Sequence, residues 1–338
     1  MHPASAIRHL QAHRYHAFTP GPRLIVTGAV HGNETCGTRA IERVIAELAR
    51  GDYEIVKGQV TFVPVCNPLA YKEKRRAGDR NLNRRLQPTP TPKDHEDHIA
   101  NVLCPMLREH DVLLDLHSFR GQGQAFVLRG PDNNQGHLEP FAHAQAEARL
   151  AAHLGPRRVV DGWMTSYAAG IEARKARAAA GDAAAAAAIE DPLYGVGTTE
   201  YMRSQGGYAV TLECGQHDDP QGPEVAYRAI RQTLALLELA DLPLEPPASS
   251  FECLQLAYVV DRHAAGDRFV RTWSSFDPLS PHDLIAVRAD GGGASSLFAF
   301  GGAGVAVEGV FCLQTGAFQP RLVGPAVLGI AATHLARD

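Results

Sequence analysis

The sequence predicts an α/β protein, in which a layered domain of strands and helices is followed by a small all-β domain. Strand-like and helix-like segments alternate over roughly the first 240 residues, which is typical of layered α/β domains. A segment rich in proline and serine, 241–250, has the composition of a domain boundary, and short β-like runs follow it. We therefore expect one domain over residues 1–245 and a β-rich domain over residues 246–338.

Apolar runs and apolar periodicity locate the elements of the first domain. Compact apolar runs with β-branched residues predict strands at 23–30, 59–68, 111–118 and 208–215. Apolar residues at helical spacing predict helices at 38–50, 96–110 and 224–240. Pro105 lies inside the second of these helices, and we expect it to kink or divide the helix.

Two further regions stand out by their composition. Residues 172–191 are mostly alanine with an interruption at Gly181, and alanine favours helix while offering little surface to bury. This region therefore predicts a surface helical hairpin or a mobile flap. After the linker, β-like runs separated by glycine, proline and aspartate predict the strands of the small domain at 253–261, 283–289, 297–302 and 304–314.

The overall composition excludes several classes of protein. Apolar residues make up 45% and charged residues 21%, as in soluble globular proteins, and the net charge of −4 argues against a dedicated nucleic-acid binder. No apolar run reaches the ~18 residues of a membrane span, and the N-terminal residues lack the apolar core of a secretory signal. Six scattered cysteines without a C-x-x-C pair are expected of a reduced cytoplasmic protein. Composition leaves the oligomeric state open and is compatible with a homo-oligomer.

The stretch VTGAVHGNETCG, residues 26–37, places His31 and Glu34 where a buried strand is expected to end. The carboxyl ends of strands form the usual ligand-binding edge of an open α/β sheet. Gly28 and Gly32 allow the backbone to turn sharply and approach a bound group closely. Imidazole and carboxylate are good zinc ligands, but two ligands make an incomplete site. The alternative interpretation is that these residues cap the next helix.

Two other strand ends carry polar side chains that complete such a site. Asp115 and His117 lie two residues apart and therefore on the same face of a strand, so that the aspartate can orient the imidazole. Glu213 ends another apolar strand, where a buried carboxylate is costly unless it is paired, metal-linked or used. As a general base it would accept a proton from zinc-activated water, although an ion-paired structural glutamate is the alternative.

The stretch YKEKRRAGDRNLNRRL, residues 71–86, is the densest basic segment of the chain. A solvated loop and a nucleic-acid patch are both open interpretations, but Tyr71 is its only aromatic residue, and base stacking requires more. Arginine and asparagine together suit a carboxylate better, because a guanidinium group pairs with it in bidentate fashion. One arginine near the metal could also polarise a carbonyl group and stabilise an oxyanion.

Four motifs, HGNE, NLNR, DLHS and TLECG, occur in this order at strand ends. Together they resemble the succinylglutamate desuccinylase/aspartoacylase family, which belongs to the wider zinc-carboxypeptidase-like group. The resemblance extends from about Leu24 to Leu237, with a small β domain following. It implies a mixed sheet flanked by helices, one zinc ion held by His31, Glu34 and His117, and Glu213 as the catalytic glutamate.

The same resemblance assigns the basic segment to the substrate. Asn83 and Arg84 match the pair that grips the substrate carboxylate, and Arg76 matches the arginine that polarises the scissile carbonyl. Arg203, ten residues before Glu213, matches by spacing alone the arginine for a second substrate carboxylate. Aspartoacylases also use a tyrosine from the C-terminal domain, whereas Tyr258, the only tyrosine after the linker, stands at no matching position.

We therefore predict a zinc-dependent hydrolase that cleaves the amide bond of an N-acyl amino acid, with a small carboxylated molecule as its substrate and no nucleic-acid or membrane partner. A zinc carboxypeptidase acting on peptides is the closest alternative, because the same apparatus would serve both reactions. An inactive protein that binds metal and carboxylates is the alternative from a different class, and binding alone would not require Glu213.

Overall fold

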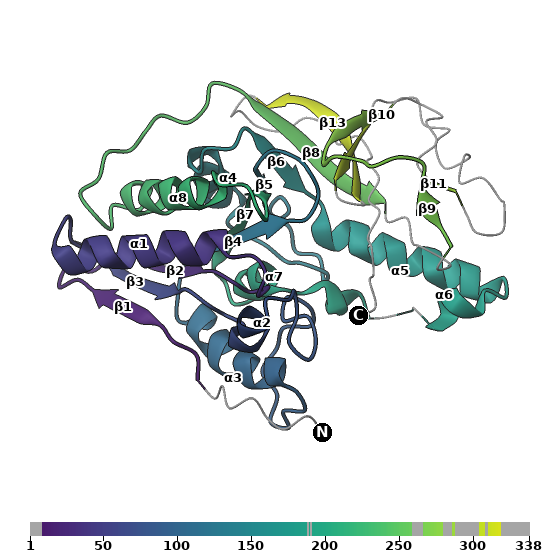
Figure 1. Ribbon diagram of the computed structural model, residues 1–338, viewed down its shortest axis with the longest axis horizontal. Helices are drawn as coiled ribbons and strands as arrows, with labels where there is room; N and C mark the ends of the chain where they lie inside the picture. Colours follow the sequence, from purple (N-terminus) through teal and green to yellow (C-terminus); the bar gives the residue numbers. More distant parts are fainter. Residues whose placement is uncertain are drawn as a thin grey trace. The chain divides into compact units, whose positions relative to one another are not determined.

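The computed structural model describes residues 9–187, 189, 191–258, 266–279, 286–287, 304–307 and 310–318 (Figure 1). The chain divides into two compact units, each with its own internal packing. The first unit comprises residues 1–119, 125–159 and 194–249. The second unit comprises residues 120–124, 160–193 and 250–338.

A mixed sheet forms the centre of the first unit, as predicted. Its strands are β1 (His13–His16), β2 (Arg23–Thr27), β3 (Gln59–Val63), β4 (Val112–Phe119), β5 (Phe126–Leu128) and β7 (Tyr208–Gln216). They lie in the order β1-β3-β2-β4-β7-β5. The pairs of β2 with β3, β2 with β4 and β4 with β7 are parallel, whereas β1 and β5 pair antiparallel at the two ends of this series.

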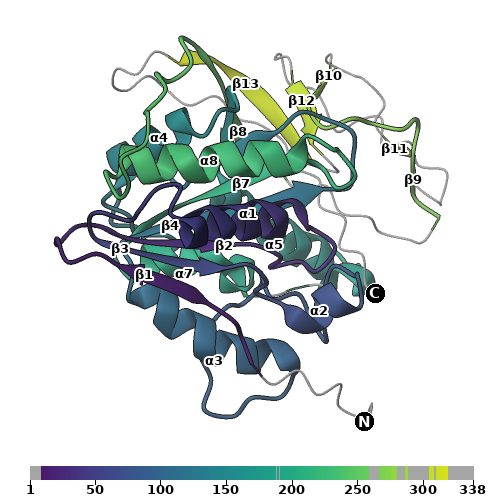
Figure 2. The ribbon, with the colours of Figure 1, turned by 60° about the vertical axis from the view of Figure 1, so that its left-hand side comes forward.

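Helices cover both faces of this sheet (Figure 2). They are α1 (Cys36–Arg50), α2 (Pro68–Lys72), α3 (His95–Arg108), α4 (Ala144–His153), α7 (Thr198–Ser204) and α8 (Gly222–Leu236). Helices α1 and α8 lie side by side on one face and α3 lies on the other (Figure 2). This arrangement explains the continuous apolar runs of the central strands, because a parallel strand buried on both faces has no side that requires polar residues.

Alternate residues of the central strands enter two separate cores. Leu24 and Val26 of β2 pack in the core with α1 and α8, whereas Ile25, between them, packs with α3. The same alternation places Leu114 of β4 in the first core and Leu113 in the second. Full burial of one such side chain stabilises the fold by about 1.5–3 kcal/mol, so the register of each strand is strongly determined.

The predicted strands and long helices of this unit are present, with differences at several of their ends: β3 ends at Val63 instead of residue 68, and α8 ends at Leu236 instead of residue 240. Strand β2 ends at Thr27 instead of residue 30, because the chain turns away at Ala29, which has a positive φ of 44°. Helix α3 is not divided at Pro105. The missing N–H of Pro105 removes one backbone hydrogen bond near the end of the helix, while buried Leu103 and Leu107 hold that turn against the sheet.

The second unit contains the predicted helical hairpin and the C-terminal strands. Helices α5 (Trp163–Ala179) and α6 (Ala183–Ala187) are joined by a turn at Gly181, whose φ of +96° favours glycine. Strands β8 (Phe251–Tyr258), β10 (Asp277–Leu279), β12 (Gly304–Val307) and β13 (Val310–Phe318) lie in the antiparallel order β8-β13-β12-β10. Strands β9 (Arg268–Phe269) and β11 (Ala286–Val287) pair separately. The predicted strand at 297–302 lies outside the described residues.

The limits of the two units bear on the predicted domains. Residues 249 and 250 separate the units close to the predicted boundary, and the segments 120–124 and 160–193 group with the C-terminal strands. Strand β6 (Arg158–Asp161) and the short helix η1 (Pro192–Gly195) span the points where the chain passes between units.

Among the described residues, no helix has both the length and the apolar character that crossing a membrane requires.

Candidate metal and active site

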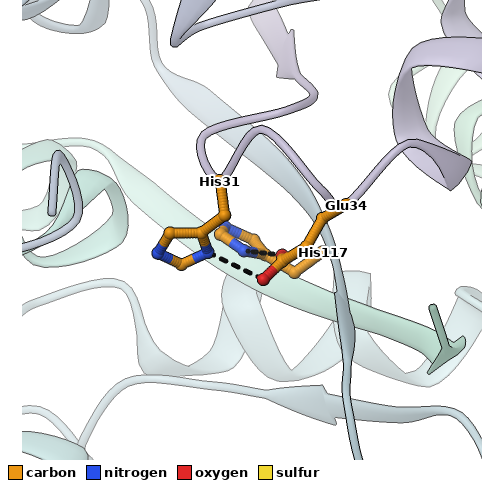
Figure 3. A group of neighbouring side chains, drawn as sticks. All are labelled: His31, Glu34 and His117. Carbon is orange, nitrogen blue, oxygen red and sulfur yellow. Dashed lines mark hydrogen bonds and ion pairs between the residues drawn. The ribbon is translucent and has the colours of Figure 1, made fainter. Parts of the chain in front are cut away.

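His31, Glu34 and His117 meet at the point where the strand order of the sheet reverses. The chain passes from β2 through α1 to β3 on one side of β2, and then returns to form β4 on the other side. Ligands of open α/β sheets bind beyond the carboxyl ends of the strands at such a switch point. His31 and Glu34 lie in the loop after β2, and His117 lies near the end of β4 (Figure 3).

The three side chains converge on one another and are almost fully buried. The relevant ligand atoms all lie within 4.8 Å of one another. His31 Nδ1 is 2.9 Å from Glu34 Oε1, and His117 Nδ1 is 2.8 Å from Glu34 Oε2 (Figure 3). Among the described residues, these three form the one group of histidine, cysteine and acidic side chains arranged to hold a metal ion.

The outer nitrogen of each imidazole is held by a hydrogen-bond acceptor. His117 Nε2 lies 2.8 Å from Asp115 Oδ2, and His31 Nε2 lies 3.1 Å from Asn81 Oδ1. An Nε2–H that donates to these oxygens leaves the Nδ1 atom of each ring as the atom that faces Glu34. Buried His31 Nδ1 has no hydrogen bond of good geometry, although Glu34 is close. This arrangement fits a cation held by the Nδ1 atoms of His31 and His117 and by the carboxylate group of Glu34.

Burial and neighbouring charges shift the pKa values of the clustered residues. Burial, reinforced by the Arg76 charge, lowers the pKa of His31 to about 4, so this imidazole is neutral at pH 7. Burial alone would raise the pKa of Glu34, but the two adjacent imidazoles hold it well below its usual range. Burial opposes protonation of His117, but the carboxylates of Asp115 and Glu34 raise its pKa well above the usual value. The cluster thus combines the neutral imidazole of His31, which can ligate a metal ion, with two buried carboxylates that raise the pKa of His117.

Asp115 anchors the site to two further segments. Its Oδ1 atom accepts a hydrogen bond from Thr27 Oγ1 at 2.6 Å, and its Oδ2 atom accepts one from the Thr198 hydroxyl group as well as from His117. Burial would raise the pKa of Asp115, but His117 and the two hydroxyl groups lower it. The aspartate therefore stays ionised and orients His117, the role that the sequence suggested for it.

Close backbone approach explains the glycine between the two predicted ligands of the loop. A Cβ atom on Gly32 would lie 2.0 Å from the carbonyl carbon of Ala70, a backbone atom that cannot move aside easily. The Gly32 N–H also donates to the Arg76 carbonyl oxygen at 3.3 Å. The loop that carries His31 and Glu34 is thus pressed against α2 and the start of the basic segment.

Arg76 lies at the edge of this cluster. Its Nη1 atom donates to Glu34 Oε1 at 2.8 Å, while its side chain is 48% exposed. A guanidinium group that reaches the buried carboxylate and is still half accessible can contact both the site and a bound molecule. The structure therefore brings Arg76 together with His31, Glu34 and His117.

A buried glutamate of α3 shapes the loop between Arg76 and Asn83. Glu96 is fully buried, and its carboxylate accepts hydrogen bonds from the backbone N–H groups of Gly78, Asp79 and Arg80 at 2.9 to 3.1 Å. Asn67 Nδ2 adds a fourth donor at 2.8 Å. Because charge-assisted hydrogen bonds are the strong ones, Glu96 holds three consecutive amides in one curve.

Part of the basic charge of this segment is neutralised within the fold. Arg80 Nε donates to Asp94 Oδ2 at 2.9 Å, and Arg80 Nη2 donates to Asp97 Oδ1 at 2.8 Å. A basic segment whose central arginine is used in this way is a poor match for a nucleic-acid surface, which needs exposed cations for the phosphates.

Asn83 and Arg84 follow in the same loop. Asn83 Oδ1 accepts a hydrogen bond from the backbone N–H of Thr198 at 2.9 Å, so Nδ2 is the end of this amide that remains to donate to a ligand. Arg84 Nη1 donates to the Asn83 carbonyl oxygen at 2.7 Å. Both side chains are half-buried, so each is held by the fold and is still partly accessible to a ligand.

The structure places Arg203 in a buried ion network. Its guanidinium group donates to Glu147 through Nε at 3.0 Å and Nη2 at 3.1 Å, and to Glu139 through Nη1 at 2.9 Å. Glu200 accepts a further contact from Nη1, and the Ala209 carbonyl oxygen accepts one from Nη2 at 2.8 Å. Every nitrogen of the group is thus engaged by the protein itself, which argues against a second substrate carboxylate at this position.

One member of this network is expected to make stability depend on pH. Burial, opposed by Arg203 and reinforced by the Glu200 and Glu147 charges, raises the pKa of Glu139 from 4.5 to about 7. The protonated Glu139 carboxyl group therefore binds its proton more tightly in the folded protein than in the unfolded chain. The stability that this proton contributes is complete below pH 4.5 and is lost as the pH rises through about 7.

Glu139→Gln should therefore raise the free energy of unfolding at pH 8 and change it little at pH 5, since glutamine does not titrate. At ~1.4 kcal/mol per pKa unit, the rise from 4.5 to about 7 corresponds to a gain of about 3 kcal/mol at pH 8. Urea unfolding of both proteins at the two pH values measures it. A stability difference that is the same at pH 5 and pH 8 would contradict this expectation.

Glu213 lies directly beside the cluster in the sheet. Strands β4 and β7 are parallel neighbours, and their register places Glu213 opposite His117. Side chains opposite each other in paired strands leave the sheet on the same face. Glu213 is only partly buried, unlike the three clustered residues. A carboxylate at this position can exchange a proton with water or with a ligand held at the cluster.

Three contributors to this site were not among the candidate site residues predicted from the sequence. Asn81 holds the His31 ring, Thr198 holds Asp115, and Glu96 holds the loop of Arg76. The NLNR motif contains Asn81, but the substrate-binding roles that the resemblance implies fall on its last two residues, Asn83 and Arg84. Thr198 and Glu96 lie in ordinary helix starts, where threonine and glutamate are common for local reasons.

Comparison with known proteins identifies the family of the chain. A model of the succinylglutamate desuccinylase/aspartoacylase catalytic domain matches residues 20–240. N-alpha-acetyl-L-2,4-diaminobutyric acid deacetylase of Halomonas elongata is 36% identical, over a part that covers 29% of this chain and 29% of that protein. The aligned region therefore spans less than a third of the length of this curated relative.

Solved structures agree in fold. Succinylglutamate desuccinylase from Vibrio cholerae superposes with a TM-score of 0.60 at 17% identity, covering 88% of this chain and 81% of that one. The Ectoine utilization protein EutE (DoeB) from Ruegeria pomeroyi gives a TM-score of 0.57 at 18% identity, covering 89% and 86%. The family model spans most of the chain and contains all the residues of the cluster. This chain belongs to the succinylglutamate desuccinylase/aspartoacylase family.

Proposed function

We propose that this protein is a zinc-dependent hydrolase that cleaves the amide bond of an N-acyl amino acid. The observation that carries the proposal is the convergence of His31 Nδ1, the Glu34 carboxylate and His117 Nδ1, with Glu213 opposite His117 on the next strand. Two imidazoles and one carboxylate are the protein ligands of a common type of catalytic zinc site. Such a site leaves further positions for water and substrate.

Zinc held by these three residues would activate water as a nucleophile and polarise the carbonyl group of the substrate. Within the protein, Asp115 orients His117, and Asn81 orients His31. Because both contacts involve Nε2, they keep the Nδ1 atoms available to the metal. Metal binding would displace the Nδ1 proton of His117, and the carboxylates of Glu34 and Asp115 would then balance the charge of a divalent cation.

Glu213 is proposed as the general base and acid. It would accept a proton from the attacking water and pass it to the nitrogen of the leaving amine, as a partly accessible carboxylate beside the cluster can do. Arg76 is proposed to stabilise the negative charge that develops on the carbonyl oxygen. Its half-exposed guanidinium group already contacts Glu34 and needs no large movement for this role.

The proposed substrate class follows from Asn83 and Arg84. An amide donor and a guanidinium group in one loop suit a carboxylate, and a free carboxylate is what distinguishes an N-acyl amino acid from a simple amide. The Halomonas elongata relative is named for the deacetylation of an N-acetylated amino acid, which supports this class. With Arg203 engaged by Glu147 and Glu139, a single substrate carboxylate is the simpler requirement.

Zinc content tests the ligand assignment. Purified protein loaded with zinc and passed over a desalting column should retain about one zinc per chain, because three ligands converge. His117→Ala should lose most of that zinc, since removal of the ring also leaves Glu34 and Asp115 without their shared partner. Mass spectrometry of the metal measures both. His153→Ala, a change at a partly exposed histidine of α4, is the control and should retain zinc as the original protein does.

The substrate class is tested with two matched panels. Zinc-loaded protein should release free amine from N-acetyl and N-succinyl amino acids and should act slowly on dipeptides that end in the same amino acid. Faster hydrolysis of dipeptides would instead establish a carboxypeptidase. Zinc binding with no hydrolysis of either panel would favour an inactive protein that binds metal and carboxylates, and would refute the proposal.

A further inference from the structure

The start of helix α7 connects the two halves of the site described above. Thr198 is the first residue of this helix and is almost completely buried. On one side it contacts Asp115, which orients the proposed metal ligand His117. On the other side it contacts Asn83, which belongs to the proposed substrate-binding pair. These three residues come from segments far apart in the sequence.

The contact with Asp115 is made by the side chain. The Thr198 hydroxyl group donates to Asp115 Oδ2, the same oxygen that accepts from His117 Nε2. Asp115 is 0% exposed and Thr198 is 1% exposed, so water does not compete for this hydrogen bond. A donor on that oxygen limits how far the carboxylate can rotate, and the carboxylate in turn sets the orientation of the imidazole.

The contact with Asn83 is made mainly by the backbone. The Thr198 N–H donates to Asn83 Oδ1 at 2.9 Å, and the hydroxyl group lies 3.4 Å from the same oxygen. Gly197 permits this approach, because a Cβ atom there would lie 2.1 Å from Asn83 Oδ1. Glu200 Oε2 accepts from the Gly197 N–H at 2.9 Å and holds the turn in place. The orientation of the Asn83 amide therefore depends on the position of the α7 start.

We propose that Thr198 is a positioning residue that couples the geometry of the metal site to the geometry of the substrate-binding loop. This inference rests on the proposed function for its substrate half, whereas its metal half depends only on zinc binding. Displacement of the α7 start should disturb His117 through Asp115 and the Asn83 amide through its oxygen. A residue that acted on the metal site alone would not have the second effect.

Thr27 provides a matched control. Its hydroxyl group donates to Asp115 Oδ1 at 2.6 Å and is fully buried, yet it has no contact with Asn83 among the described residues. Thr27→Val and Thr198→Val each remove one hydroxyl donor from the same aspartate and preserve the shape of the side chain. Both changes should weaken zinc binding by about 10-fold, within the 10- to 100-fold range known for residues behind metal ligands.

The substrate readout should separate the two variants. At saturating zinc, Thr198→Val should raise the KM for an N-acetyl amino acid several-fold. Valine keeps the backbone N–H that donates to Asn83 but loses the hydroxyl contacts to Asp115 and Asn83, so the α7 start that orients the Asn83 amide can shift. Thr27→Val should leave the KM within about twofold. Thr198→Ser, which keeps the hydroxyl group and the backbone contact, should restore both zinc affinity and KM. An equal KM for the two valine variants would overturn the coupling.

A second measurement does not depend on hydrolysis. Zinc affinity, determined by competition with a chromogenic chelator, is compared for Asn83→Ala, Thr198→Val and the double variant. Coupling through Thr198 predicts that Asn83→Ala weakens zinc binding several-fold in the original protein and changes it little when Thr198 is already valine. Independent, multiplying effects would overturn the proposal even if the protein proved to have no amidase activity. If Thr198→Val fails to fold, Thr198→Ala serves in the same cycle.

Discussion

Glu213→Gln should retain zinc and the native fold and should lose most of its turnover. Glutamine has nearly the shape of glutamate but cannot accept the proton of the attacking water or return it to the leaving amine. Loss of a general base commonly lowers kcat by ~10²- to 10⁴-fold. The KM should change much less, because Glu213 lies beside the cluster and not in the loop of Asn83 and Arg84.

The measurement is kcat on an N-acetyl amino acid, together with zinc content and melting temperature for each protein. Glu42→Gln makes the same chemical change at an exposed position of α1 and should have the activity of the original protein. Near-normal kcat in Glu213→Gln with intact zinc would assign the proton transfer to another group. A simultaneous loss of zinc would make Glu213 part of the metal site instead.

Arg203→Met should strongly destabilise the fold. It would leave Glu139, Glu147 and Glu200 facing one another in a buried position without their shared cation. Removal of one partner from a buried ion pair typically costs about 3–5 kcal/mol, because the remaining charge is neither solvated nor paired. The free energy of unfolding in urea at pH 8, where Glu139 is ionised, measures this loss.

An exposed arginine supplies the comparison. Arg228 pairs with Glu245 at 2.9 Å, a distance similar to those of Arg203, but both side chains are more than half exposed. Exposed ion pairs contribute about 0–1 kcal/mol, so Arg228→Met should have almost no effect. If Arg203→Met instead unfolded like the original protein and raised the KM only for substrates with two carboxylates, the predicted second substrate clamp would be correct.

Kinetics on matched substrates address the same residue without unfolding the protein. Arg203→Lys loses the bidentate contact with Glu147, which lysine does not reproduce. It should therefore lower stability while reducing kcat/KM equally for substrates with one and with two carboxylates. This outcome is the opposite of the one that follows from the spacing of Arg203 relative to Glu213.

Local patterns in the sequence were sufficient to predict the four central strands and the three long helices of the first unit, although they did not predict β1, β5, α2, α4 or α7. Strands such as β4 arise from short continuous apolar runs and helices such as α8 from apolar residues at a period of 3.6, and both patterns are local properties of the sequence. The same patterns located His31, Glu34 and His117 at strand ends. Because parallel strands deliver their carboxyl ends to one edge, the structure could be expected to bring these three side chains together.

Tertiary structure decided the partners of the buried charges. Arg203 and Glu213 are separated by a fixed spacing that matches the family, yet Arg203 pairs with Glu147 and Glu139, which lie 56 and 64 positions away in the chain. A guanidinium group pairs with whichever carboxylates the fold places beside it, and sequence spacing contains no such information. Sequence patterns also could not predict the roles of Thr198 and Glu96, because their contacts join segments that meet only in the folded protein.

The sequence by itself thus determined the central strands, the long helices and the residues at the switch point, since these follow from local apolar patterns and from residue types that favour metals. Only the folded chain decided which polar groups hold those residues in place and which arginines remain accessible. Burial makes this second decision, because an ionised group removed from water must be paired, and its nearest partner is set by packing. Arg76 stays half exposed beside Glu34, whereas Arg203 is enclosed by glutamates.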